Sequence, residues 1–124
     1  MNSSAMAVLM AGLLPVVCAG IAKWGAKGYD NHDPRAWLAR QQGYRARANA
    51  AQQNSLEAFP FFAVAVLLAL HNGASPPVVS FWAWGFVGLR LLYIFCYVSD
   101  QATLRSIVWM LAWAVTIRLY VLAF

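Results

Sequence analysis

The stretch QQNSLEAFPFFAVAVLLAL, residues 52–70, begins with polar side chains and continues into hydrophobic ones. A helix needs about 20 mostly apolar residues to cross a hydrocarbon core of about 30 Å, and the apolar part, residues 58–70, is too short alone. We therefore expect this helix to begin near residue 48. That extension brings Asn54 and Glu57 to the membrane boundary, where polar side chains serve either helix packing or ligand binding.

The chain as a whole has the composition of a membrane protein. Hydrophobic residues make up 62% of its 124 residues and charged residues only 10%, which is too little charge to cover a soluble domain of this size. We expect one all-α domain, a bundle of four transmembrane helices. The expected spans are residues 5–26, 48–71, 77–98 and 102–124.

The net charge of +5 is concentrated on one side of such a bundle. Six basic residues lie between the first two spans and Arg105 follows the third, whereas the connection HNGASPP between spans two and three has no Lys or Arg. The positive-inside rule then places the basic loops in the cytoplasm and both termini outside. Contact with anionic lipid explains this charge, so we expect no nucleic-acid partner. The six basic residues between the first two spans are Lys23, Lys27, Arg35, Arg40, Arg45 and Arg47.

Residues that favour helix caps indicate where helices start. Asp33 followed by Pro34 is a good N-cap and first-turn pair, and we expect a helix that runs on to Leu70, with Gly43 as a weak point. At 1.5 Å per residue such a helix is about 55 Å long, so part of it would leave the membrane. Ser99 or Asp100 is expected to cap the last helix.

Cysteine and histidine give no sign of a metal site. Cys18 and Cys96 both lie inside apolar spans, where they are packing residues. His32 and His71 fall in turns without the spacing of metal ligands. Lys23 and Lys27 follow the first span and no basic residue precedes it, so we expect a retained helix rather than a signal peptide.

A polar stripe precedes the second span. Arg47, Asn54 and Glu57 are separated by seven and three residues, which places them on nearly the same helix face. Pro60 follows one turn later and bends the helix by removing a backbone hydrogen bond. The stripe is either the wall of a pocket or a packing surface.

A second polar cluster lies in the third span. Arg90, Tyr93 and Tyr97 share one face, and Arg90 is deep enough to require an interior partner. Glu57 is the acid at comparable depth, so we expect a Glu57–Arg90 ion pair, a ligand-binding role for either residue, or both. Arg105 is either a membrane anchor or a cation that holds a thiolate, because a nearby positive charge lowers a thiol pKa.

These segments resemble a known family. ANAAQQNSLEAFPFF (48–62), RLLYIFCY (90–97) and TLR (103–105) are similar to the membrane-associated proteins in eicosanoid and glutathione metabolism, the MAPEG family, and the chain looks like a member of a small bacterial branch. The similarity covers nearly the whole chain. Its most specific part is Asn-x-x-Glu-x-x-Pro, formed here by Asn54, Glu57 and Pro60.

The resemblance implies a homotrimer in a bacterial inner membrane, with glutathione bound between neighbouring protomers on the cytoplasmic side. It assigns glutathione binding to Asn54, Glu57 and Tyr93, a place in the site to Tyr97, and activation of the thiol to Arg105. We accordingly take Arg105 and Tyr97 as the catalytic candidates.

The chain departs from the family pattern at two positions. Active members usually have arginine where this chain has Ala50, and often an aromatic residue at Ala58. Arg47, one turn earlier, is a candidate replacement for the missing cation, and Arg90 completes the expected glutathione-binding set.

Three functions are compatible with these residues. The leading hypothesis is a glutathione-dependent transferase or peroxidase that acts on a lipophilic small molecule arriving through membrane lipid. The alternative is a non-catalytic homologue whose polar residues serve helix packing and trimer assembly. A small multidrug transporter is a third, although such proteins hold their essential glutamate deep in the first helix, whereas Glu57 lies near the start of the second span.

Overall fold

The computed structural model describes residues 3–124, which form five helices. Four of them are long and apolar enough to cross a membrane, and residues 3–124 contain no strand. The expected four-helix, all-α architecture is therefore confirmed. The helices are α1 (Ser3–Lys23), α2 (Pro34–Ala39), α3 (Tyr44–His71), α4 (Pro76–Val98) and α5 (Ala102–Leu122).

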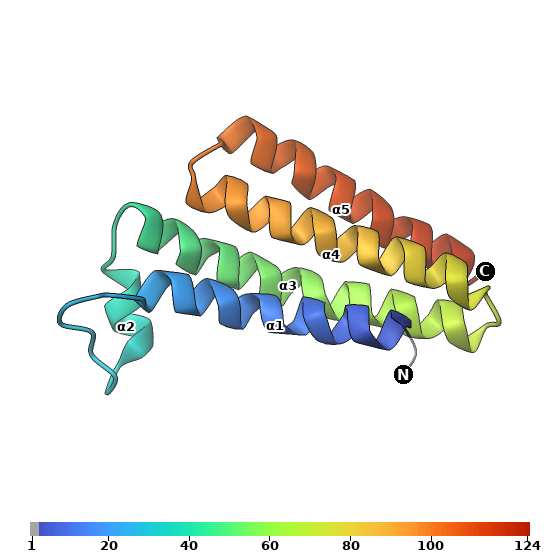
Figure 1. The fold of residues 1–124 in the computed structure, drawn as a ribbon, viewed down its shortest axis with the longest axis horizontal. Helices are drawn as coiled ribbons and strands as arrows, with labels where there is room; N and C mark the ends of the chain where they lie inside the picture. Colours follow the sequence, from blue (N-terminus) through green and yellow to red (C-terminus); the bar gives the residue numbers. More distant parts are fainter. Residues whose placement is uncertain (1–2) are drawn as a thin grey trace.

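The four long helices run side by side along the long axis of the molecule (Figure 1). The most extensive contacts between helices are those of α1 with α3 and of α4 with α5. The α1–α2 and α4–α5 connections lie at one end, which we call the basic end because most of the Lys and Arg residues are there. The two termini and the α3–α4 connection lie at the other end, the terminal end.

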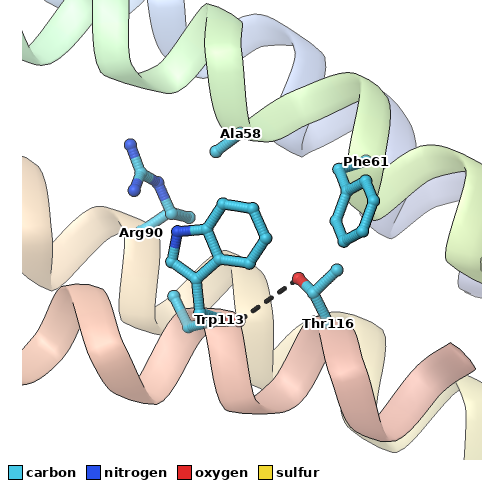
Figure 2. Close-up of a pocket in the computed structure, with 6 residues that line it drawn as sticks. Ala58, Phe61, Arg90, Trp113 and Thr116 are labelled. Atoms are coloured by element: carbon cyan, nitrogen blue, oxygen red, sulfur yellow. Dashed lines mark hydrogen bonds between the residues drawn. The ribbon is translucent and has the colours of Figure 1, made fainter. Parts of the chain in front are cut away.

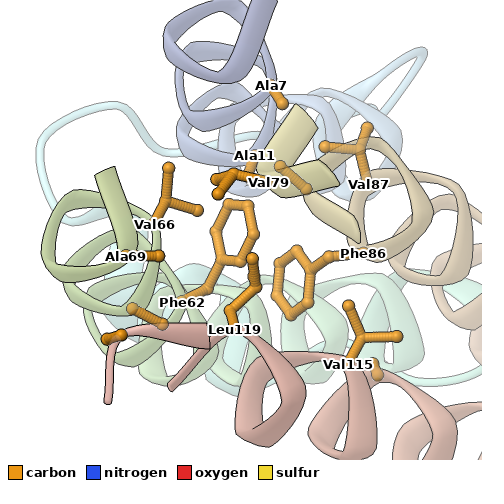
Figure 3. Close-up of a cluster of buried hydrophobic side chains, with 14 residues drawn as sticks. Ala7, Ala11, Phe62, Val66, Ala69, Val79, Phe86, Val87, Val115 and Leu119 are labelled. Carbon is orange, nitrogen blue, oxygen red and sulfur yellow. The ribbon is translucent and has the colours of Figure 1, made fainter. Parts of the chain in front are cut away.

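Aromatic and small side chains fill the core between the helices. The rings of Phe62 from α3 and Phe86 from α4 stack with centroids 3.9 Å apart (Figure 3). Ala7 and Ala11 bring α1 against this stack. At Gly12 an added Cβ would lie 3.2 Å from the Phe59 ring. Small residues on α1 thus let its backbone approach α3 closely, as in other membrane bundles.

The helix that starts at Pro34 is not continuous. Asp33 caps α2 as expected, with its Oδ1 accepting a hydrogen bond from the Ala36 amide at 3.3 Å. However, α2 ends at Ala39 and α3 starts after Gly43, whose φ of 64° is in the region that favours glycine. The expectation of one helix from residue 34 to 70 is therefore wrong, because the chain turns at Gly43.

The expected cap of the last helix is also wrong. The N-cap position of α5 is Gln101, which makes no side-chain capping bond. Ser99 instead ends α4, and its Oγ donates to the Phe95 carbonyl oxygen at 2.6 Å. Asp100 has a φ of 63° and turns the chain. Both polar residues are used in leaving α4, so neither is placed to cap α5.

Arginines from the start of α3 tie the basic end together. Arg45 Nη1 donates to the Ala22 carbonyl oxygen of α1 at 2.9 Å, and Arg47 Nε donates to the Val98 carbonyl oxygen of α4 at 3.1 Å. The last carbonyl groups of a helix lack partners within it, and positive charge there suits the helix dipole. Arg45 and Arg47 therefore fix the ends of two neighbouring helices.

At the terminal end, hydrogen bonds between neutral polar groups join the helices. The hydroxyl groups of Ser4 and Ser80 lie 2.8 Å apart and join α1 to α4. The side-chain amide of Asn72, which follows α3, donates to the Ala123 carbonyl oxygen at 2.7 Å.

Candidate functional site

Two arginines and two tyrosines form a continuous series of contacts near the basic end. The Arg90 Cζ atom lies 4.1 Å from the centroid of the Tyr93 ring, and Tyr93 meets Tyr97 edge to face at 5.7 Å. The Arg105 Cζ atom lies 4.3 Å from the centroid of Tyr97. We call these four residues the Arg–Tyr ladder. It forms because residues 90, 93 and 97 share one face of α4 and the short turn after Val98 brings α5 back beside them.

The Arg90 end of the ladder is closed. Arg90 is only 2% exposed, and its Nη2 donates to Ser55 Oγ at 3.1 Å. Ser55 is itself 4% exposed on α3. A charged group inside a membrane bundle requires such polar contacts, because lipid offers none. The Tyr93 ring adds a cation–π contact with the guanidinium.

A small cavity lies beside Arg90, between α3, α4 and α5. Ala58 and Phe61 lie on its α3 side, and Trp113 and Thr116 on its α5 side (Figure 2). Its volume is about 10 Å³, which is close to the smallest space that holds one water molecule. This end of the ladder therefore has no room for an organic ligand.

The expected Glu57–Arg90 ion pair does not form within residues 3–124. The Glu57 side chain is exposed, and Arg90 uses Ser55 as its hydrogen-bond partner. Two residues along a helix differ by about 160° in direction, so Ser55 faces the core when Glu57 faces outward. Ser55 and Glu57 lie at similar heights along α3, but the rotation of α3 about its axis turns Ser55, and not Glu57, toward Arg90.

The Arg105 end of the ladder is open. Tyr93, Tyr97 and Arg105 line a hollow of about 190 Å³, together with Ser106 and Trp109 of α5. We call it the α4–α5 hollow. Arg105 is half-buried, so its charge is partly screened from water but still accessible. A cation in this position can stabilise a thiolate or another anion that enters the hollow.

Asn54 is the second unusual polar group. Its Oδ1 is buried and has no hydrogen-bond partner among residues 3–124. Leaving a buried acceptor unpaired costs about 1–3 kcal/mol, so this atom is suited to a donor from another molecule. Neither Asn54 nor Glu57 lines the α4–α5 hollow.

A single chain thus brings together some of the residues expected to bind glutathione or to take part in catalysis. Arg90, Tyr93, Tyr97 and Arg105 are in contact, whereas Asn54, Glu57 and Arg47 lie outside the hollow within one chain. Arg47 is engaged with the Val98 carbonyl oxygen of α4.

Sequence reasoning missed three residues near the ladder: Ser55, Ser106 and Trp109. Trp109 could have been found, because it follows Arg105 by four residues and therefore shares its helix face. Ser55 gave no signal of its own, since its role depends on which helix α3 meets. Within the described residues, no group of three His, Cys, Asp or Glu side chains is placed to hold a metal ion.

Four helices long and apolar enough to span a membrane define a multi-pass membrane protein, and a hollow lined by Arg105 and two tyrosines lies near one end of it. A sequence model of the MAPEG family matches residues 3–124, essentially the whole chain. The chain belongs to the MAPEG family. Comparison with curated proteins and with solved structures gives no match.

Proposed function

We propose that this protein is a glutathione-dependent transferase or peroxidase that acts on lipophilic electrophiles. Its membership of the MAPEG family supports this assignment. The observation that carries it is the position of Arg105, whose guanidinium is stacked on Tyr97 at the side of the α4–α5 hollow.

Arg105 would act on the thiol of glutathione. The reactive species is the thiolate, and a guanidinium beside the sulfur favours loss of its proton. In the transferase reaction the thiol proton passes to water, the electron pair of the thiolate sulfur forms a bond to carbon, and the leaving group departs with the electrons of the bond that breaks. Tyr97, which Arg105 holds in place, would donate its hydroxyl proton in a hydrogen bond to the anion.

A second copy of the chain would complete the site. The α4–α5 hollow is about 190 Å³, whereas pockets for ligands of this size are about 300–1,000 Å³. Among residues 3–124, Asn54 Oδ1 has no hydrogen-bond partner, Glu57 is exposed, and neither residue lines this hollow. These features support an assembly in which Asn54 and Glu57 of one copy and the α4–α5 hollow of its neighbour bind the same glutathione, and the family resemblance implies that this assembly is a homotrimer.

The site would face the cytoplasm of a bacterial cell. Lys and Arg are concentrated at the basic end, and the positive-inside rule places that end in the cytoplasm. Glutathione would then arrive from water and the lipophilic substrate from the bilayer. Proximity of the two reactants and stabilisation of the thiolate would supply most of the rate acceleration.

Calorimetric titration of the detergent-purified protein with reduced glutathione tests this function. We expect saturable heat from the native protein and from Arg118→Ala, an exposed arginine near the other end of α5. Arg105→Ala should lose the ultraviolet thiolate absorbance that develops on binding. Absence of heat from a well-folded native protein would contradict the proposal.

A non-catalytic role in assembly is the second candidate. Arg47 and Arg90 favour this candidate, because both donate hydrogen bonds to other helices and neither lines the α4–α5 hollow. Ala50 also stands where catalytic members of the family usually have arginine. A protein that stays trimeric, gives no heat with glutathione and has no turnover would support this candidate.

A further inference from the structure

A second hollow lies at the basic end, between α2 and α3. Its volume is about 360 Å³, and we call it the α2–α3 hollow. Arg35 and Leu38 of α2 form one side, and the carboxamide side chains of Asn49, Gln52 and Gln53 of α3 form the other. The residues that line it include no acid.

The residues that line this hollow include none of those proposed to bind glutathione. Asn49, Gln52, Gln53 and Leu56 follow the i, i+3, i+4, i+7 pattern of a single helix stripe. Asn54 is two residues from both Gln52 and Leu56, which places it about 160° around the helix axis. The α2–α3 hollow and the α4–α5 hollow therefore have no lining residue in common, and Asn54 points away from the α2–α3 hollow.

The polar groups of the hollow suit a singly charged anion with several oxygen atoms. Arg35 supplies a permanent positive charge and up to five N–H donors, and each carboxamide supplies two more donors. None of the residues that line the hollow is an acid that would compete for these donors. A phosphodiester presents one negative charge and several acceptor oxygens, so it matches this set of donors.

An apolar surface continues from the hollow toward the membrane centre. Leu56 lines the hollow and is 54% exposed, and Pro60 and Leu67 follow on the same face of α3 at spacings of four and seven residues. Leu67 is 63% exposed. A ligand with hydrocarbon chains gains contact along this surface, whereas a free phosphate does not.

We propose that the α2–α3 hollow binds an anionic phospholipid. Its phosphate lies between Arg35 and the carboxamides of Asn49, Gln52 and Gln53, and one acyl chain lies along Leu56 and Leu67. The short helix α2 is positioned for this role, because Trp37 and Leu38 are buried and hold Arg35 at the edge of the hollow. This site does not depend on glutathione binding.

Native mass spectrometry of the full-length protein, released from detergent, tests the proposal. The protein is titrated with phosphatidylglycerol and, separately, with phosphatidylcholine. We expect saturable retention of phosphatidylglycerol at least about tenfold stronger than that of phosphatidylcholine, because both lipids carry the phosphodiester but the choline ammonium adds a positive charge that the Arg35 guanidinium repels. Arg35→Gln should remove most of this preference.

Arg40→Gln is the matched control. Arg40 is an exposed arginine of the same connection, five residues away, and it does not line the hollow. It should keep the preference, whereas Gln52→Leu should reduce it without changing charge. Gln52→Leu also keeps the test decisive if Arg35→Gln fails to fold, which circular dichroism and size-exclusion chromatography will show.

Four results would overturn the proposal. The first is equal retention of the two lipids, and the second is an equal loss in Arg35→Gln and Arg40→Gln, which would indicate general surface charge. The third is competition by glycerol 3-phosphate at the affinity of the lipid, which would assign the hollow to a soluble phosphate ester. The fourth is a lipid-independent change of oligomeric state in Arg35→Gln, which would make the hollow a contact between copies.

Discussion

The two ends of the Arg–Tyr ladder have the same chemistry and different surroundings. Arg90 and Arg105 each stack on a tyrosine ring, with Cζ-to-centroid distances of 4.1 and 4.3 Å. Arg90 is buried and bonded to Ser55, beside a cavity no larger than a water molecule. Arg105 borders a hollow of about 190 Å³. The two arginines therefore differ in their accessibility and not in residue type. The buried Arg90 stabilises the bundle, whereas the accessible Arg105 is available to a ligand.

Removing the accessible arginine should give the largest effect, and it should act on turnover. We expect Arg105→Ala to lower kcat/KM about 100- to 1,000-fold, because it removes the charge that stabilises the thiolate. The melting temperature should stay close to that of the native protein. Rates with glutathione and a lipophilic electrophile, beside the Arg118→Ala control, would measure this, and an unchanged rate would remove Arg105 from the reaction.

Removing the partner of the buried arginine should act on stability instead. Ser55→Ala leaves Arg90 without its side-chain acceptor, and a hydrogen bond to a charged group contributes about 1.5–3 kcal/mol. Thermal unfolding in detergent would detect this loss. Ser106→Ala is the control, since Ser106 is exposed and its Oγ donates to the Ala102 carbonyl oxygen of its own helix. Equal melting temperatures for the two variants would mean that Arg90 does not need Ser55.

Variants of Tyr97, in the middle of the Arg–Tyr ladder, should separate an effect on turnover from an effect on stability. Tyr97→Phe keeps the ring on which Arg105 stacks but removes the hydroxyl, so we expect a roughly tenfold lower turnover with little change in stability. Tyr97→Leu also removes the ring and should lower both. If Tyr97→Phe is fully active, the tyrosine acts only by positioning Arg105.

The smallest effect is expected at the end of α4. Arg47→Gln weakens the contact with the Val98 carbonyl oxygen and should reduce the free energy of unfolding by about 0.5–1 kcal/mol. Arg40→Gln removes an exposed arginine as a control. A large loss of glutathione affinity in Arg47→Gln at unchanged stability would instead support Arg47 as the replacement for the cation missing at Ala50.

Sequence patterns predicted those features of the fold that depend on local chemistry. Hydrophobic length indicated four spans, and the Asp33–Pro34 pair correctly marked the start of α2. The break at Gly43 was only partly foreseen, because glycine permits a positive φ without requiring one.

The site was harder to predict because it depends on how helices rotate against one another. Spacing on α4 was sufficient to place Arg90, Tyr93 and Tyr97 on one face. No spacing could decide whether Arg90 meets Ser55 or Glu57, because both lie at a similar depth and only the packing of α3 separates them. The carboxamide stripe on the outer face of α3 did have a readable i, i+3, i+4 signal, at Asn49, Gln52 and Gln53.

The polar ties at both ends of the bundle have a consequence for bilayers of different thickness. Arg45 and Arg47 fix α1 and α4 to α3 at one end, and the Ser4–Ser80 contact fixes α1 to α4 near the other. Sliding of α1, α3 or α4 past either of the other two would break at least one of these bonds. When the hydrocarbon layer thins or thickens, the protein must therefore tilt as a unit or deform the surrounding lipid.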